Sequence, residues 1–122
     1  MAPHKNQPFL ARLRFAVEGL KHGLRTEHSL RVQITIFGLV LAVLVLLRPE
    51  PLWWGLVILA SSCVVGAELF NTTLEHLVDH LHPQVHPQIR NVKDCAAAAV
   101  LIATLGAVGV SIALLVHLLR PS

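Results

Sequence analysis

Charged residues are scarce in this sequence. Only 14% of the 122 residues are Asp, Glu, Lys or Arg, whereas 54% are hydrophobic and the mean hydropathy is +0.64. Soluble domains carry about 25% charged residues, so the composition argues against a soluble globular protein. Because the apolar residues come in long blocks, we expect a single membrane domain over residues 1–122.

Cysteines and aromatic residues are also few. Cys63 and Cys95 lie within or beside apolar runs, and their spacing matches no metal or redox motif. We therefore expect both to be small packing residues. Lys and Arg outnumber Asp and Glu by 10 to 7, and they are concentrated in the N-terminal third. With few aromatics beside them, these cations fit attraction to anionic lipid headgroups better than nucleic-acid binding.

The phosphate-binding motifs of soluble kinases are missing. The segment from Gly19 to Gly23 lacks the spacing of a P-loop, and no kinase-type glycine-rich loop occurs elsewhere. Any phosphoryl transfer by this chain would therefore use a fold unrelated to those of the soluble kinases.

Hydrophobic periodicity predicts an all-α integral membrane protein. Residues 8–26 pair an apolar face with a cationic one, which is typical of an amphipathic helix lying on a membrane surface. Three transmembrane helices are predicted to follow, over residues 30–47, 52–81 and 95–119, and the second extends into the cytoplasm. Pro83 and Pro87 predict a cytoplasmic loop over residues 82–92.

The distribution of cations predicts the orientation of the spans. One side of the predicted topology carries Lys5, Arg12, Arg14, Lys21, Arg25, Arg31, Arg90 and Lys93. The opposite side carries only Arg48 and Arg120. Because cationic flanks stay in the cytoplasm, we expect the N-terminus and the histidine-rich loop to be cytoplasmic.

The second predicted span ends in a stripe of polar side chains. At about 100° per residue, one narrow helix face carries Glu68, Asn71, Thr72, Glu75 and Asp79. Carboxylates at the end of a hydrophobic helix are unfavourable unless they have a function or a partner. The predicted topology brings Glu27, Lys93 and Asp94 to the same side of the membrane.

These residue types are those that phosphoryl transfer requires. Glu27 and Glu75 could share a Mg²⁺ ion, since hard cations prefer carboxylate oxygens. Lys93 could neutralise phosphate oxygens. Glu68, about two turns deeper than Glu75, could accept the proton of a lipid hydroxyl. A metal, a cation and a base together favour phosphoryl transfer.

Simpler interpretations stay open for each residue. A carboxylate at a helix end can be an interfacial charge, and Asp79 can pair with an N-terminal arginine. Lys93 and Asp94 can cap and flank the third span. The histidines at positions 76, 80, 82 and 86 could bind a transition metal, although His76 and His80 are expected to point away from the stripe. A solvated histidine-rich loop is favoured over a metal site.

A longer pattern carries a family resemblance. The string Glu68-Leu-Phe-Asn71-Thr72-Thr73-Leu-Glu75-x-x-x-Asp79, followed by Lys93-Asp94 and Ala98-Ala99-Val100-Leu101, resembles the prokaryotic diacylglycerol kinase family. Gly19-Leu20 and Glu27 fit upstream, and the resemblance runs from about Phe15 to Leu119. It implies a homotrimeric lipid kinase of the bacterial cytoplasmic (inner) membrane, with sites shared between subunits. It also implies transfer of the γ-phosphate of MgATP to diacylglycerol, giving phosphatidic acid.

The resemblance also implies roles for individual residues. Glu68 would be the general base, and Glu27 and Glu75 the magnesium ligands. The residues that would contact ATP are Glu27, Glu75, Gln84, Val85, His86, Lys93 and Asp94. Asn71 and Asp79 would support them, and Arg12 is the nearest candidate for the nucleotide-contacting arginine of the family.

Two departures leave the substrate open. Ala97 stands where family members with a firm diacylglycerol preference often carry serine, and Gln33 stands where a further glutamate can occur. An undecaprenol kinase is therefore the alternative within the family. A non-enzymatic membrane assembly protein, or an ion-conducting oligomer, is the alternative from another class. It would explain three spans but gives no reason for Glu68, Asn71 and Glu75 to share a face.

Overall fold

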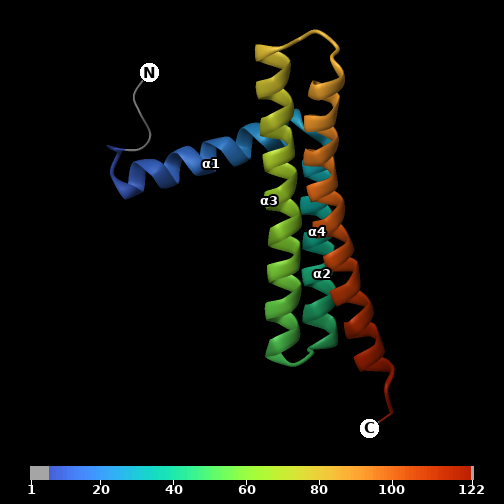
Figure 1. Cartoon of the computed structure of the whole chain (residues 1–122). Helices are drawn as coiled ribbons and strands as arrows, with labels where there is room; N and C mark the ends of the chain where they lie inside the picture. The colour runs from blue at the N-terminus through green and yellow to red at the C-terminus, as the bar shows by residue number, and fades with distance from the viewer. Residues whose placement is uncertain (1–5, 122) are drawn as a thin grey trace.

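The structure is a computed structural model that describes residues 6–121. It consists of four helices in the order α1 (Phe9–Thr26), α2 (His28–Leu47), α3 (Pro51–Leu81) and α4 (Pro87–Leu119). Figure 1 shows α2, α3 and α4 running side by side as a bundle, while α1 projects sideways from it. The all-α prediction is confirmed. Lys5 of the predicted cationic segment lies outside the described residues.

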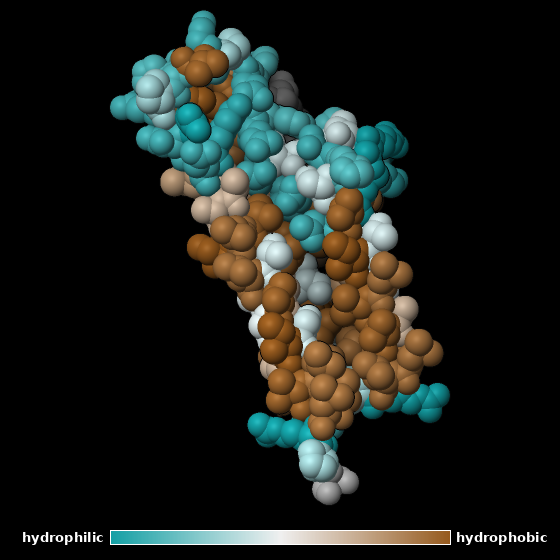
Figure 2. Space-filling view, turned by 90° about the vertical axis from the view of Figure 1, so that its right-hand side faces the viewer, coloured by the Kyte–Doolittle hydropathy of each residue, from teal (hydrophilic) through white to brown (hydrophobic). Residues whose placement is uncertain are grey.

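Three helices are long and apolar enough to cross a membrane. They are α2, α3 and α4, with 20, 31 and 33 residues. At 1.5 Å per residue, α2 is about 30 Å long and matches a hydrocarbon core, whereas α3 and α4 are longer than the core. Figure 2 shows apolar side chains over most of the length of the bundle and hydrophilic ones at both ends. The three predicted spans are thus confirmed by length and composition, while the surface position of α1 stays a prediction.

The buried core is small and lies at the end of the bundle away from α1. Leu44, Val57 and Leu114 form it, one from each long helix, and Trp53 and Trp54 pack against it. Most other apolar side chains face outward, as expected where lipid is the solvent. At the opposite end Leu30 is buried as well, and polar contacts around the predicted site also join the helices there.

The predicted loop over residues 82–92 is wrong in its second half. α4 begins at Pro87 instead of at residue 95, so only residues 82–86 separate it from α3. Proline suits the first position of a helix, where its missing N–H would have no partner. His86 caps this end, because its Nδ1 accepts a hydrogen bond of 3.1 Å from the backbone N–H of Gln88. Pro87 therefore starts a helix and does not prolong the loop.

The joint between α1 and α2 is a single residue, Glu27. Its extended backbone (φ −113°, ψ 113°) turns the chain, and its N–H donates to the carbonyl of Gly23 at 2.8 Å. Gly23 is buried, and a Cβ added there would lie 2.8 Å from Leu30 Cδ2 and 3.3 Å from Leu69 Cδ2. Glycine leaves room for this close approach of α1 to Leu30 of α2 and Leu69 of α3, since a side chain here would require those leucines to shift.

Candidate active site

The polar stripe of α3 runs from a buried to an exposed environment. Glu68 and Thr72 are buried, with 6% and 8% of their surfaces exposed. Glu75 is half-buried and Asp79, one turn further on, is exposed. Glu68 and Glu75 are separated by about 10 Å along the helix axis. The stripe predicted from the sequence therefore exists as one face, and its members differ in their access to water.

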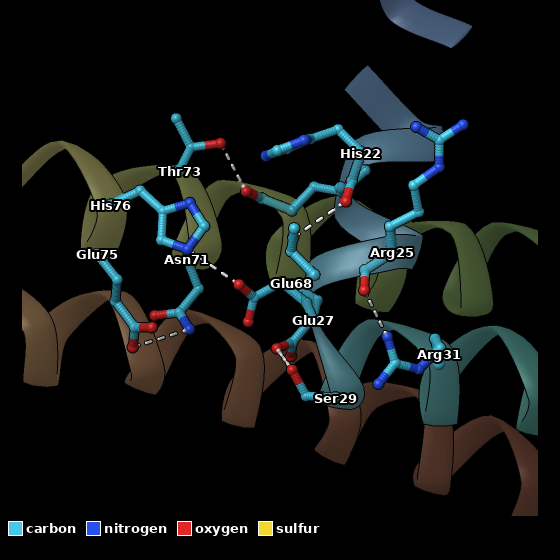
Figure 3. A network of polar contacts seen from close by, with 12 residues as sticks. His22, Arg25, Glu27, Ser29, Arg31, Glu68, Asn71, Thr73, Glu75 and His76 are labelled. Atoms are coloured by element: carbon cyan, nitrogen blue, oxygen red, sulfur yellow. Dashed lines mark hydrogen bonds and ion pairs between the residues drawn. The ribbon is translucent and has the colours of Figure 1, made fainter. Parts of the chain in front are cut away.

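Glu68 is held by a residue of α2. The hydroxyl of Ser29 donates to Oε1 of Glu68 at 2.5 Å, across 39 positions of the sequence. Ser29 lies in the first turn of α2, two residues after the joint at Glu27. The hydrogen bond therefore ties the buried carboxylate of α3 to the segment that carries Glu27, as Figure 3 shows. Sequence reasoning did not identify Ser29, because a serine in a first helical turn normally bonds its own backbone.

Glu27 also contacts α3. Its Oε1 lies 2.9 Å from Nε2 of His76, and the Glu27 side chain is only 23% exposed. The sequence did not predict this contact, because His76 was expected only to point away from the polar stripe of its own helix, and Glu27 lies outside that stripe. His76 directly follows Glu75, so this contact holds the α1–α2 joint against the part of α3 that carries Glu75. Figure 3 shows Glu27, Glu68, Glu75 and His76 in one polar network.

Asn71 has an unused acceptor. Its Nδ2 donates to Oε1 of Glu75 at 3.4 Å. Its Oδ1 is buried and has no hydrogen-bond partner within residues 6–121. A buried acceptor without a partner is unfavourable, and such atoms in native proteins usually serve a ligand or a water. Asn71 thus offers an oxygen next to the carboxylate of Glu75.

A second group of predicted residues lines a cavity at the α3–α4 turn. The cavity is about 230 Å³ and is bounded by Asp79, His82, Pro83, Gln84, Val85, His86, Ile89, Arg90, Lys93 and Asp94. Apart from the carboxylates Glu27 and Glu75, all the residues that the sequence predicted to contact ATP line this cavity. Arg90, one turn before Asp94, adds a cation that the sequence analysis had not assigned to the nucleotide.

Lys93 and Asp79 join the two helices across this cavity. Lys93 Nζ lies 2.5 Å from Oδ1 of Asp79, and the side chains are 36% and 59% exposed. The alternative that Asp79 pairs with an N-terminal arginine is therefore wrong. Lys93 and Asp94 are not caps either, because α4 begins at Pro87 and they are its seventh and eighth residues. Asp94 faces Arg90 at 3.9 Å.

The oxygen donors near the joint fit a hard divalent cation. Glu27 and Glu75 supply carboxylates, and the orphan Oδ1 of Asn71 supplies a neutral oxygen. In the part of the chain that the structure describes, no three His, Cys, Asp or Glu side chains form a group that could hold a metal ion by themselves. Mg²⁺ is commonly bound by one or two carboxylates and completed by water and phosphate oxygens, so the donor set is compatible with it.

Two predicted residues stay apart from these contacts. Arg12 lies on α1, which projects away from the bundle, and its side chain is exposed. Ala97 is exposed on α4, whereas Glu68 is buried on α3. The fold of one chain therefore joins neither residue to the polar network or to the cavity at the α3–α4 turn.

Comparison with known proteins gives two matches. The family model described as prokaryotic diacylglycerol kinase matches residues 14–115. A diacylglycerol kinase of Synechocystis sp. is 33% identical over 100 residues, which cover 81% of this chain and 57% of that protein. The chain thus spans just over half the length of this curated relative. The region matched by the family model contains every predicted site residue except Arg12.

Proposed function

This chain belongs to the prokaryotic diacylglycerol kinase family, and we propose that it transfers the γ-phosphate of MgATP to diacylglycerol, giving phosphatidic acid. One observation carries the proposal. Carboxylates from the α1–α2 joint and from α3 converge where the apolar part of the bundle ends, and the most buried of them, Glu68, lies on the apolar side. A lipid alcohol and a water-soluble phosphate donor can meet only at such a boundary.

Glu68 accepts the proton of the lipid hydroxyl in this proposal. As the hydroxyl oxygen attacks the γ-phosphorus, the bond between that phosphorus and the bridging oxygen breaks and ADP leaves. A base must lie where the hydroxyl stays while the acyl chains remain in the bilayer, and burial of Glu68 at the end of the apolar region fits this requirement. Near that base, little water competes with the alcohol for the phosphoryl group.

The remaining polar residues bind the donor. Lys93 and Arg90 bring positive charge to the cavity at the α3–α4 turn, where phosphate oxygens are favoured partners. Glu27 and Glu75, with Oδ1 of Asn71, would hold Mg²⁺. When bound, that ion would neutralise charge on the phosphates and orient them.

Two further features concern the assembly and the orientation. The cavity of about 230 Å³ is below the range of about 300–1,000 Å³ for small-molecule sites, so this cavity by itself is small for a nucleotide. A homotrimer with sites shared between subunits would complete it, and would also explain why Arg12 is remote from the other proposed site residues of its own chain. We place the protein in the bacterial cytoplasmic (inner) membrane with the N-terminus in the cytoplasm, where ATP is available.

A lipid-labelling assay tests the proposal and separates the two lipid substrates. Purified full-length protein in mixed micelles receives labelled ATP, Mg²⁺ and either diacylglycerol or undecaprenol. We expect faster labelling of diacylglycerol, and labelling reduced to a small residual rate in Glu68→Gln with nucleotide binding retained. The matched control is Glu18→Gln, since Glu18 is an exposed carboxylate of α1. Faster labelling of undecaprenol would assign the alternative substrate, and labelling of neither lipid would refute a lipid kinase.

A further inference from the structure

Glu68 is the only buried charged residue within residues 6–121. One of its oxygens, Oε1, accepts the hydroxyl of Ser29 at 2.5 Å. The other, Oε2, has no partner among the described residues. Since Asn71 Oδ1 is the only fully buried side-chain polar atom there without a partner, Oε2 is not sealed from ligands. One carboxylate oxygen therefore has a hydrogen-bond partner in the chain, while the other has none and keeps some exposed surface.

The position of Ser29 follows from the joint that precedes α2. Glu27 turns the chain, His28 begins the helix, and Ser29 follows in the first turn. Neighbouring hydroxyls behave differently, because Thr26 and Thr35 both donate to the carbonyl four residues earlier in the chain. Ser29 donates instead to a side chain of another helix. Its only side-chain hydrogen bond in the described chain is thus with the proposed base.

We propose that Ser29 is a positioning residue for Glu68. By holding Oε1, its hydroxyl fixes the carboxylate so that Oε2 faces the substrate alcohol. This inference rests on the proposed function, because it requires Glu68 to accept the proton of a lipid hydroxyl. In the transfer step that proton moves to Oε2, the alcohol oxygen bonds to phosphorus, and ADP leaves. Ser29 keeps its own proton throughout.

If Ser29 only fastened α2 to α3, its removal would have different effects. It would lower the stability of the fold, and its effect would be independent of whether residue 68 is a carboxylate. A positioning role acts on the transfer step, because a freely rotating carboxylate spends less time in the productive geometry. It therefore lowers kcat, leaves the KM values for MgATP and lipid nearly unchanged, and disappears when the base is removed.

The experiment compares five variants of the full-length protein in mixed micelles. Ser29→Ala is expected to lower kcat by about tenfold to a hundredfold, equivalent to about 1.4–2.7 kcal/mol, with both KM values within about twofold. Ser29→Thr restores the hydroxyl and is expected to recover most of the turnover. Ser29→Ala combined with Glu68→Gln is expected to be no slower than Glu68→Gln alone. Thr35→Ala, which removes a hydroxyl bonded within α2, is the control expected to match the wild type.

Each other outcome overturns the inference. If the wild type is active and Ser29→Ala has the same kcat, the positioning role is refuted while the proposed function stands. The same holds if kcat of the double variant is lower than that of Glu68→Gln by the full factor seen for Ser29→Ala. A wild type that labels neither lipid refutes the proposed function and the inference with it. Thermal unfolding in the same micelles checks the fold. If Ser29→Ala does not fold, Ser29→Cys replaces it, since a thiol of similar size donates only weakly, and the same loss of kcat is expected.

Discussion

Adding one methyl group at Gly23 should displace the α1–α2 joint. The new Cβ would lie 2.8 Å from Leu30 Cδ2 and 3.3 Å from Leu69 Cδ2, so the leucine side chains would have to shift, and Leu30 is fully buried. Overpacking of this kind costs about 1–3 kcal/mol. Alanine also favours the helix by about 0.8–1.0 kcal/mol relative to glycine. The net loss of stability for Gly23→Ala is therefore expected to be about 0–2 kcal/mol.

Gly19→Ala separates the two contributions. Gly19 lies one turn earlier in α1, and a Cβ there would meet nothing within 4 Å. The gain in helix propensity is common to both variants, so their difference isolates the steric effect, about 1–3 kcal/mol. Because Glu27 and Ser29 follow within six residues of Gly23, we also expect Gly23→Ala, but not Gly19→Ala, to raise KM for MgATP and lower kcat. Denaturant unfolding in micelles and the labelling assay measure these effects. Equal stability and equal activity of the two variants would refute the close packing at Gly23.

Three other variants test separate contacts. Glu75→Gln should raise KM for MgATP by at least about tenfold, because a hydrogen bond or ligand bond to a charged group contributes about 1.5–3 kcal/mol. An unchanged KM would exclude Glu75 from metal binding. Asp79→Asn should lower the stability of the fold by less than about 1 kcal/mol, since both members of its pair with Lys93 are partly exposed. The difference in thermal midpoint between this variant and the wild type should shrink at high salt. Arg31→Gln should make the joint more sensitive to limited proteolysis, because Arg31 donates to the carbonyls of Leu24 and Arg25, and cleavage no faster than in Lys21→Gln would contradict this.

The helices and the polar stripe of α3 were accessible from the sequence because both follow from periodicity. Long apolar runs select spanning helices, and positions 68, 71, 75 and 79 share a face on any helix. The start of α4 was misplaced because proline has two meanings, as a breaker inside a helix and as a favoured first residue. Only the cap by His86 decides between them at Pro87, and the sequence does not show that hydrogen bond.

Contacts between helices were the part that periodicity could not supply. Ser29 meets Glu68, and His76 meets Glu27, only because the turn at Glu27 brings the first residues of α2 against the middle of α3. That approach depends on the missing side chain of Gly23. The one local signal of this approach in the sequence is a glycine four residues before the acidic helix junction. It shows that a close contact is possible there, but it does not indicate which residues make it.

The gradient of burial along α3 explains why one helix can serve two reactants. Glu68 is buried and Asp79 is 59% exposed, while the two are about 16 Å apart along the axis. In the proposed kinase, the lipid hydroxyl reaches the inner end of this face and the nucleotide reaches the outer end. Glu75 and Glu27 lie between the ends, where the transferring phosphate must pass. Ser29 holds Glu68 at the inner end, while His76 and Asn71 hold Glu27 and Glu75 in the middle. Removing Ser29 should therefore impair transfer more than binding, whereas removing His76 or Asn71 should also weaken MgATP binding.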